Sequence, residues 1–221
     1  MADASDEANL ELANALREMA QALLDHEVDA EAARRALGEL GRARAHLEGP
    51  TRPRWYEMEA PHAFSASATG QPSTASIFDT LSPVRGQLNA VAPPLTMEMA
   101  EREDGSLFVL GHARLSRVYE GPPRGVHGGW VAALFDEMLG ATMGLAPPPG
   151  VTAKLAVEYR HLTPIEEDLR LEAWITDDRE RRIQAAATCH AGETLTATAS
   201  ALFVRVDFKQ VEARMRARRT G

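Results

Sequence analysis

Gly128 and Gly129 begin an apolar stretch that runs to Leu145, and this stretch constrains the fold more than any other part of the chain. Its apolar side chains recur at helical spacing, and the prolines from Pro147 to Pro149 end the pattern. On both sides of it, apolar and polar residues alternate with a period of two, which is typical of strands. The sequence therefore predicts one helix, over residues 129 to 145, inside a β-rich domain.

Strand patterns surround this helix on both sides. Two precede it and are joined by a turn at Asp104-Gly105, and four more follow it with short connections. Such connections join antiparallel neighbours, so we expect a mainly antiparallel sheet around one central helix, an α+β fold. The predicted strands cover residues 95–102, 106–117, 153–161, 169–177, 182–190 and 194–207.

The chain is predicted to have four parts. Residues 1–49 read as a helical hairpin, with Asp29 as the N-cap of its second helix. Residues 50–83 read as an extended arm, 84–207 as the main domain and 208–221 as a basic tail. The first helix carries one apolar stripe of the kind that packs on its own domain or on a neighbouring subunit; its members are Leu12, Leu16, Met19 and Leu23.

Composition excludes several classes of protein. The net charge of −8 argues against a nucleic-acid partner, which needs a basic field. No apolar run approaches the roughly 20 residues of a membrane span. Cys189 is the only cysteine and the N-terminus is acidic, so a reducing, cytoplasmic location is expected. The seven histidines lack metal-ligand spacing, and no metal or cofactor is expected.

The start of the central helix carries the candidate chemistry. Backbone N–H groups in the turn at Gly128 can hold a developing negative charge. Asp136 lies within the apolar helix, where a carboxylate loses solvation and is expected to have a specific partner or task. A donor and a base together favour attack of activated water on a carbonyl. The face around this carboxylate is made of small residues: Gly129, Ala132, Ala133 and Gly140.

Distance places these two groups in different subunits. Gly128 and Asp136 are eight residues apart, or about 12 Å along a helix. A base and an oxyanion donor must both reach one carbonyl centre within roughly 3 Å. Two antiparallel copies of the helix would bring Gly128 of one subunit toward Asp136 of the other, so a site here implies a dimer with two composite sites.

The segment Arg124-Gly125-Val126-His127-Gly128-Gly129, with an acid nine residues after the histidine, resembles the hotdog-fold acyl-CoA thioesterases of the phenylacetate-pathway (PaaI-like) branch. Thr152, Lys154, Val157 and Tyr159-Arg160, followed by Pro164, are similar to that family's strand after the central helix. The resemblance covers residues 84 to 207. It implies a sheet wrapped around a long helix, and a homodimer or a tetramer built as a dimer of dimers.

The resemblance also implies roles for particular residues. Asp136 would be the base or nucleophile, the Gly128 N–H would polarise the thioester carbonyl, His127 would orient the site or contact the carbonyl region, and Thr152 would hold the attacking water. Gly129, Lys154 and Arg160 are expected to contact the acyl-CoA substrate. Lys154 departs from the small polar residue expected at its position, and it could instead bind a CoA phosphate. Further phosphate candidates are Arg179, Arg181 and Arg182.

The expected activity is therefore hydrolysis of acyl-CoA thioesters. Two alternatives belong to other classes: a non-hydrolytic acyl-CoA-binding protein or dehydratase of the same fold, and a dimerisation scaffold whose working part is the N-terminal hairpin. Release of free thiol from acyl-CoAs separates hydrolysis from binding. Catalysis that survives deletion of residues 1–48 would argue against the scaffold.

Overall fold

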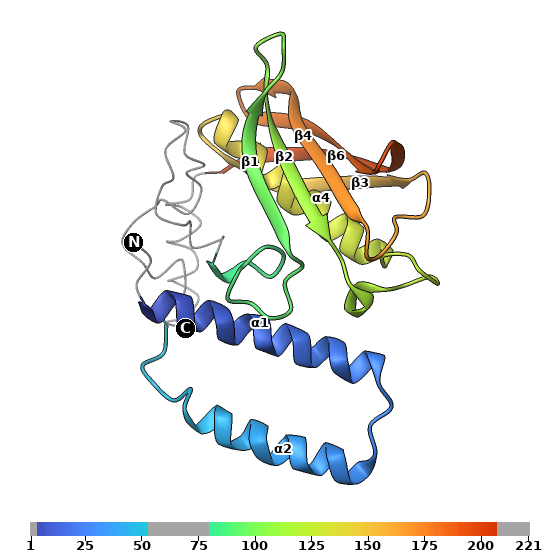
Figure 1. Ribbon diagram of the computed structural model, residues 1–221. Coiled ribbons are helices and arrows are strands. Elements are labelled where there is room, and N and C mark those ends of the chain that lie inside the picture. The colour runs from blue at the N-terminus through green and yellow to red at the C-terminus, as the bar shows by residue number, and fades with distance from the viewer. Residues whose placement is uncertain (1–3, 53–79, 207–221) are drawn as a thin grey trace, which may run out of the picture.

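A computed structural model of the protein describes residues 4–52 and 80–206 (Figure 1). An N-terminal pair of helices, α1 (Ala4–Asp25) and α2 (Ala30–Ala45), precedes a domain in which one sheet curls around a single long helix, α4 (Gly128–Ala141). The predicted α+β, hotdog-type arrangement is confirmed. Most of the predicted extended arm and all of the predicted basic tail lie outside the described residues.

The sheet has six antiparallel strands in the order β1-β2-β4-β5-β6-β3. Every predicted strand is present, with ends that shift by a few residues. Alternation places one face of the strands against α4, whose side chains fill the core. The strands are β1 (Leu95–Glu101), β2 (Leu107–Arg114), β3 (Gly150–Tyr159), β4 (Asp168–Arg179), β5 (Arg182–Ala191) and β6 (Thr194–Arg205).

Two predicted boundaries differ because 3-10 turns replace regular structure. The helix expected to reach Leu145 ends as an α-helix at Ala141 and continues as η4 (Thr142–Leu145). There the Thr142 hydroxyl donates to the Leu139 carbonyl over 2.6 Å, a local bond that competes with the regular helical pattern. The second strand stops at Arg114, and η3 (Arg117–Tyr119) follows it.

Strand β3 is an edge of the sheet, since it pairs with β6 on one side only. Its pairing register shifts between Thr152 and Lys154, which marks a β-bulge. Beyond the bulge, Leu155 and Val157 pack against the core beside α4. The strand therefore runs along the helix with its other edge open to pairing.

The N-terminal pair is attached to the domain through α1. Asp29 caps α2 as predicted, accepting the Ala32 N–H over 2.8 Å. The Arg17 guanidinium donates to the carbonyls of Gln87 and Asn89 over 2.8 and 2.9 Å, which ties α1 to the loop before β1. Ala13 is buried beside it, whereas the predicted stripe that includes Leu16 and Leu23 is exposed, so the stripe is not the face that packs on the domain.

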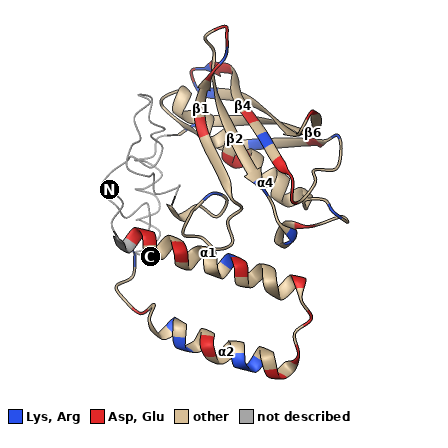
Figure 2. Cartoon of the chain, in the orientation of Figure 1, with Lys and Arg blue, Asp and Glu red and all other residues tan. Residues whose placement is uncertain are grey.

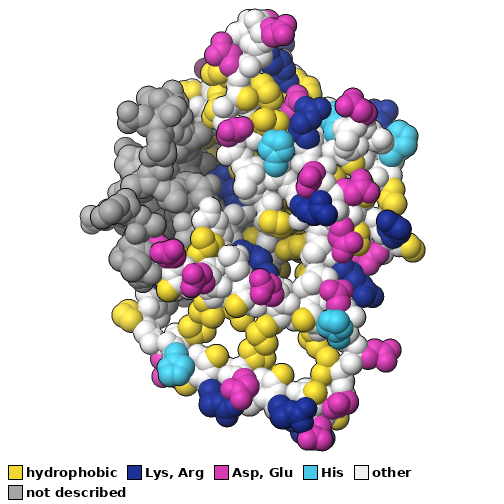
Figure 3. Space-filling model, viewed as in Figure 1, with side chains coloured by type: hydrophobic (Ala, Val, Ile, Leu, Met, Phe, Trp, Pro, Cys, Tyr) yellow, Lys and Arg dark blue, Asp and Glu magenta, His cyan; other side chains and the backbone are white. Residues whose placement is uncertain are grey.

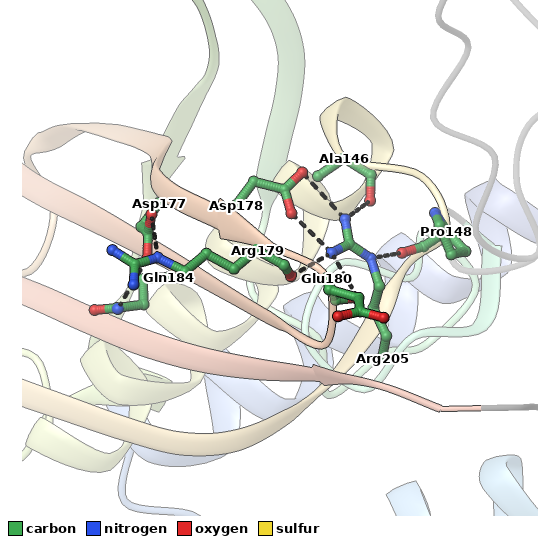
Figure 4. Close-up of polar contacts among 8 residues, drawn as sticks. All are labelled: Ala146, Pro148, Asp177, Asp178, Arg179, Glu180, Gln184 and Arg205. Carbon is green, nitrogen blue, oxygen red and sulfur yellow. Dashed lines mark hydrogen bonds and ion pairs between the residues drawn. The ribbon is translucent and has the colours of Figure 1, made fainter.

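A second set of side-chain contacts, made by Arg205, joins separate segments of the main domain (Figure 4). The Arg205 side chain, at the end of β6, pairs with Asp178 over 2.7 Å and donates to the carbonyls of Pro148 and Arg179 over 2.9 and 2.8 Å. It also reaches the carbonyl of Ala146. One guanidinium thus joins β6, the β4–β5 turn and the loop after η4.

In the described residues no helix is long and apolar enough to cross a membrane.

Candidate active site

One face of α4 is open to solvent along its length. Gly129 and Asp136 are exposed, and the small residues between and beyond them are only partly covered. The expectation that Asp136 loses solvation within an apolar helix is therefore wrong for the single chain. The reason is geometric: the buried rows of α4 face the sheet, and the small-residue row faces away from it.

Asp136 has one partner on the neighbouring strand. The Thr152 hydroxyl donates to Asp136 Oδ1 over 3.1 Å. The β-bulge that follows Thr152 is the feature that lets it share the helix-facing side with Leu155, three residues further on. The bond occupies one carboxylate oxygen and leaves Oδ2 to accept a hydrogen bond from water.

At the other end of the face, His127 is the N-cap of α4. Its Nδ1 accepts the Gly129 N–H over 3.0 Å, so the ring proton belongs on Nε2, which can still donate. In the part of the chain that the structure describes, the Gly128 N–H meets no acceptor. The helix therefore begins with one backbone donor used by His127 and one available to a ligand.

Tyr159 completes this end of the site. Its hydroxyl donates to the Gly128 carbonyl over 2.8 Å, and its ring lies so near that a Cβ on residue 128 would be 3.3 Å away. A side chain at position 128 would therefore need the Tyr159 ring to shift by a few tenths of an ångström. In the sequence, Leu155, Val157 and Tyr159 alternate within the predicted strand 153–161, which puts Tyr159 on the face of the other two and was the available signal; no role was predicted for it.

The neighbouring acid, Glu137, has a structural role. It accepts from the Ser82 hydroxyl over 3.2 Å and pairs with Arg85 over 3.0 Å, with both side chains of the ion pair largely covered. Glu137 therefore fastens α4 to the loop before β1. Of two consecutive carboxylates on the helix, only Asp136 lies on the open face.

The predicted substrate-binding side chains do not gather around Asp136. Lys154 is exposed and precedes Leu155, which packs on the core, so Lys154 points to the opposite face of β3. Arg160 is exposed and pairs with Glu158 over 2.5 Å, and Arg179 pairs with Asp177 at the sheet end. Arg181 and Arg182 are exposed in and beside the β4–β5 turn.

Cys189 offers no competing nucleophile. It is buried within β5, and burial raises the pKa of its thiol, so the thiol stays protonated at neutral pH. The open face of α4 therefore holds the candidate chemistry: a carboxylate bonded to a hydroxyl at one end and a helix-start donor at the other.

The known proteins to which this chain is similar are thioesterases. No family model matches the sequence. The human acyl-coenzyme A thioesterase THEM5 is 25% identical over 93 residues, which are 41% of this chain and 38% of THEM5. This chain thus matches well under half the length of that relative.

Solved structures extend the likeness. The crystal structure of RHA08564, a thioesterase superfamily protein, is 28% identical with a TM-score of 0.73, covering 89% of this chain and 94% of that one. A hypothetical thioesterase from Streptococcus pneumoniae, solved with coenzyme A, is 14% identical with a TM-score of 0.44 over 50% of this chain and 86% of its own.

The fold makes the chain a hotdog protein. It is similar to proteins of the thioesterase superfamily.

Proposed function

We propose that the protein hydrolyses acyl-CoA thioesters, with water activated by Asp136. The observation that carries the proposal is the Thr152–Asp136 hydrogen bond on the open face of α4. The turn at Gly128, capped by His127, begins the same helix. An exposed carboxylate held by a hydroxyl has the geometry of a base with one oxygen fixed and the other directed at water. The likeness to thioesterases supplies the substrate class.

The reaction follows from the groups present. Asp136 takes a proton from water as the water oxygen attacks the thioester carbonyl carbon, and Thr152 positions that water. The carbonyl oxygen becomes an oxyanion, which the Gly128 N–H stabilises at the positive end of the helix. The tetrahedral intermediate collapses and the C–S bond breaks. The CoA thiolate leaves and takes from Asp136 the proton that came from water. These steps use only groups of the chain and water.

A second copy of the chain completes each site in this proposal. Gly128 and Asp136 lie at opposite ends of the same helix face, about 12 Å apart at 1.5 Å per residue. The open edge of β3, beside that face, can pair with the same edge of another copy. Antiparallel pairing would set Gly128 of one subunit against Asp136 of the other, cover the small-residue face and shield the carboxylate and its attacking water from bulk solvent.

Replacement of Asp136 by Asn tests the assignment of the base. Asn keeps the shape and still accepts from Thr152, but it cannot take a proton from water. We expect kcat for a panel of acyl-CoAs to fall by about two to four decades, the usual range for a lost general base. Release of free thiol gives the rate, and circular dichroism reports whether the fold is kept.

The matched control is Glu137→Gln. It removes a carboxylate from the next position of the same helix, where the partner is Arg85. We expect lower thermal stability and a kcat within a few-fold of wild type. Wild-type kcat in Asp136→Asn would overturn the role of Asp136. A wild-type protein that binds acyl-CoA without releasing thiol would favour the binding-protein alternative.

A further inference from the structure

Within the described residues, the N-terminal pair of helices leaves an apolar groove uncovered. Figure 3 shows hydrophobic side chains of α1 and α2 facing one another across an open gap, with empty spaces between them. Helix α2 contributes no buried residue, and Leu37 is 67% exposed. We call this feature the hairpin groove; its apolar lining is Leu12, Leu16, Met19, Leu23, Leu37 and Leu40.

Helix α2 is expected to be stable only when another segment packs on its apolar face. A 16-residue helix with no residue buried by the described part of the chain is marginal in water, because helices in proteins draw their stability mainly from packing of an apolar face. Gly38 and Gly41 weaken α2 further, and the space beside both is empty. Glycine at such positions permits the close approach of another helix.

The charges of the two helices indicate what covers it. Helix α1 carries five carboxylates and one arginine, whereas α2 carries four arginines and two carboxylates (Figure 2). On α2, Arg35 and Arg42 pair within the helix, with Glu31 and Glu39. Among the described residues, Arg34 and Arg44 of α2 make no ion pair, and neither do the acids of α1 other than Asp25.

These unpaired charges have matching spacing. Glu7 and Glu18 are eleven residues apart on one side of α1, or about 16 Å at 1.5 Å per residue. Arg34 and Arg44 are ten residues apart on α2, or about 15 Å. They flank Leu37, the most exposed large apolar residue of that helix. A helix like α1 laid on α2 would bury Leu37 and set both acids against both arginines.

We propose that the hairpin groove is an interface with a second copy of this chain, in which two hairpins pack face to face about a two-fold axis. Helix α1 of each copy then lies on α2 of the other, and a four-helix bundle forms with its apolar side chains inside. Symmetry satisfies both helices at once, because each copy offers one acidic and one basic surface. The proposal is independent of the catalytic assignment, since neither helix contributes to the site.

Cross-linking between copies tests the interface directly. Cys189 is the only native cysteine and is buried, so a cysteine introduced on the surface is the only reactive one among the described residues. Leu37→Cys in the full chain is treated with a short bismaleimide in dilute solution, and dimers are counted on a denaturing gel. The matched control is Arg35→Cys, on the charged face of the same helix. We expect cross-linked dimer at position 37, and at least tenfold less at position 35.

Charge reversal then identifies the contact. In the Leu37→Cys background, Arg34→Glu with Arg44→Glu should reduce cross-linking at least tenfold, and adding Glu7→Arg with Glu18→Arg should restore it. Reversal of Arg35 and Arg42, on the other face, should leave it unchanged. The proposal is overturned if cross-linking is equal at positions 37 and 35 or ignores charge reversal. It is also overturned if the thiol introduced at position 37 is shielded from maleimide without forming dimer, because the chain's own residues 53–79 would then be the cover.

Discussion

At the scale of single residues, one peptide group organises the start of α4. The peptide between Gly128 and Gly129 is held at both ends: Tyr159 donates to its carbonyl, and His127 accepts from its N–H. With both ends fixed, the turn cannot rotate to redirect the neighbouring Gly128 N–H. A donor that is pre-oriented costs no reorganisation when charge develops on the substrate, which is how oxyanion sites gain their effect.

Removal of the Tyr159 hydroxyl tests this arrangement. In Tyr159→Phe the ring still packs on Gly128, but the carbonyl loses a hydrogen bond. We expect kcat for acyl-CoA hydrolysis to fall about tenfold, equivalent to about 1.4 kcal/mol, with KM within about twofold of wild type. Tyr119→Phe is the control, because it removes a hydroxyl bonded to the Ala92 carbonyl away from the site. A Tyr159→Phe protein with wild-type kcat and a lower melting temperature would make Tyr159 purely structural.

At the scale of elements, Arg205 joins segments that are distant in sequence. Its side chain is 14% exposed and bonds to groups on the β4–β5 turn and on the loop after η4 (Figure 4). We expect Arg205→Met to lower the free energy of unfolding by about 2 kcal/mol, since the carbonyls and Asp178 lose a charged donor. Arg179→Met should change it by less than about 0.5 kcal/mol, because that side chain is 80% exposed. Urea unfolding measures both, and equal losses would contradict the assignment.

The helices and strands were predictable from the sequence, but the side-chain contacts that join them were not. Alternation of Leu155, Val157 and Tyr159 identified a strand and its inner face, because the period of two is local in sequence. The partners of the Arg205 side chain come from positions 25 to 59 residues earlier, and no local pattern records them. The β-bulge after Thr152 was equally hidden, so the sequence indicated a hydroxyl near Asp136 only through the family resemblance.

At the scale of the whole molecule, the open face of α4 and the open edge of β3 lie together. The sequence alone predicted that Gly128 and Asp136 are too far apart to serve one carbonyl, because that distance follows from helix geometry. It could not predict that Asp136 is exposed in a single chain, because exposure depends on which side of α4 the sheet covers. Both findings favour sites shared between subunits.

Complementation between two inactive variants tests shared sites. Asp136→Asn removes the base, and Gly128→Pro removes the donor N–H. Proline is tolerated as the first residue of a helix, and His127, at φ −59° and ψ 131°, has the backbone conformation favoured before it.

Each variant alone should be nearly inactive. When they are co-refolded in equal amounts, half the dimers are mixed, and each mixed dimer holds one intact site and one with both lesions. We expect about one quarter of wild-type activity from random pairing about a two-fold axis. If base and donor served one carbonyl within a single chain, mixing would restore nothing, and the shared-site proposal would fail.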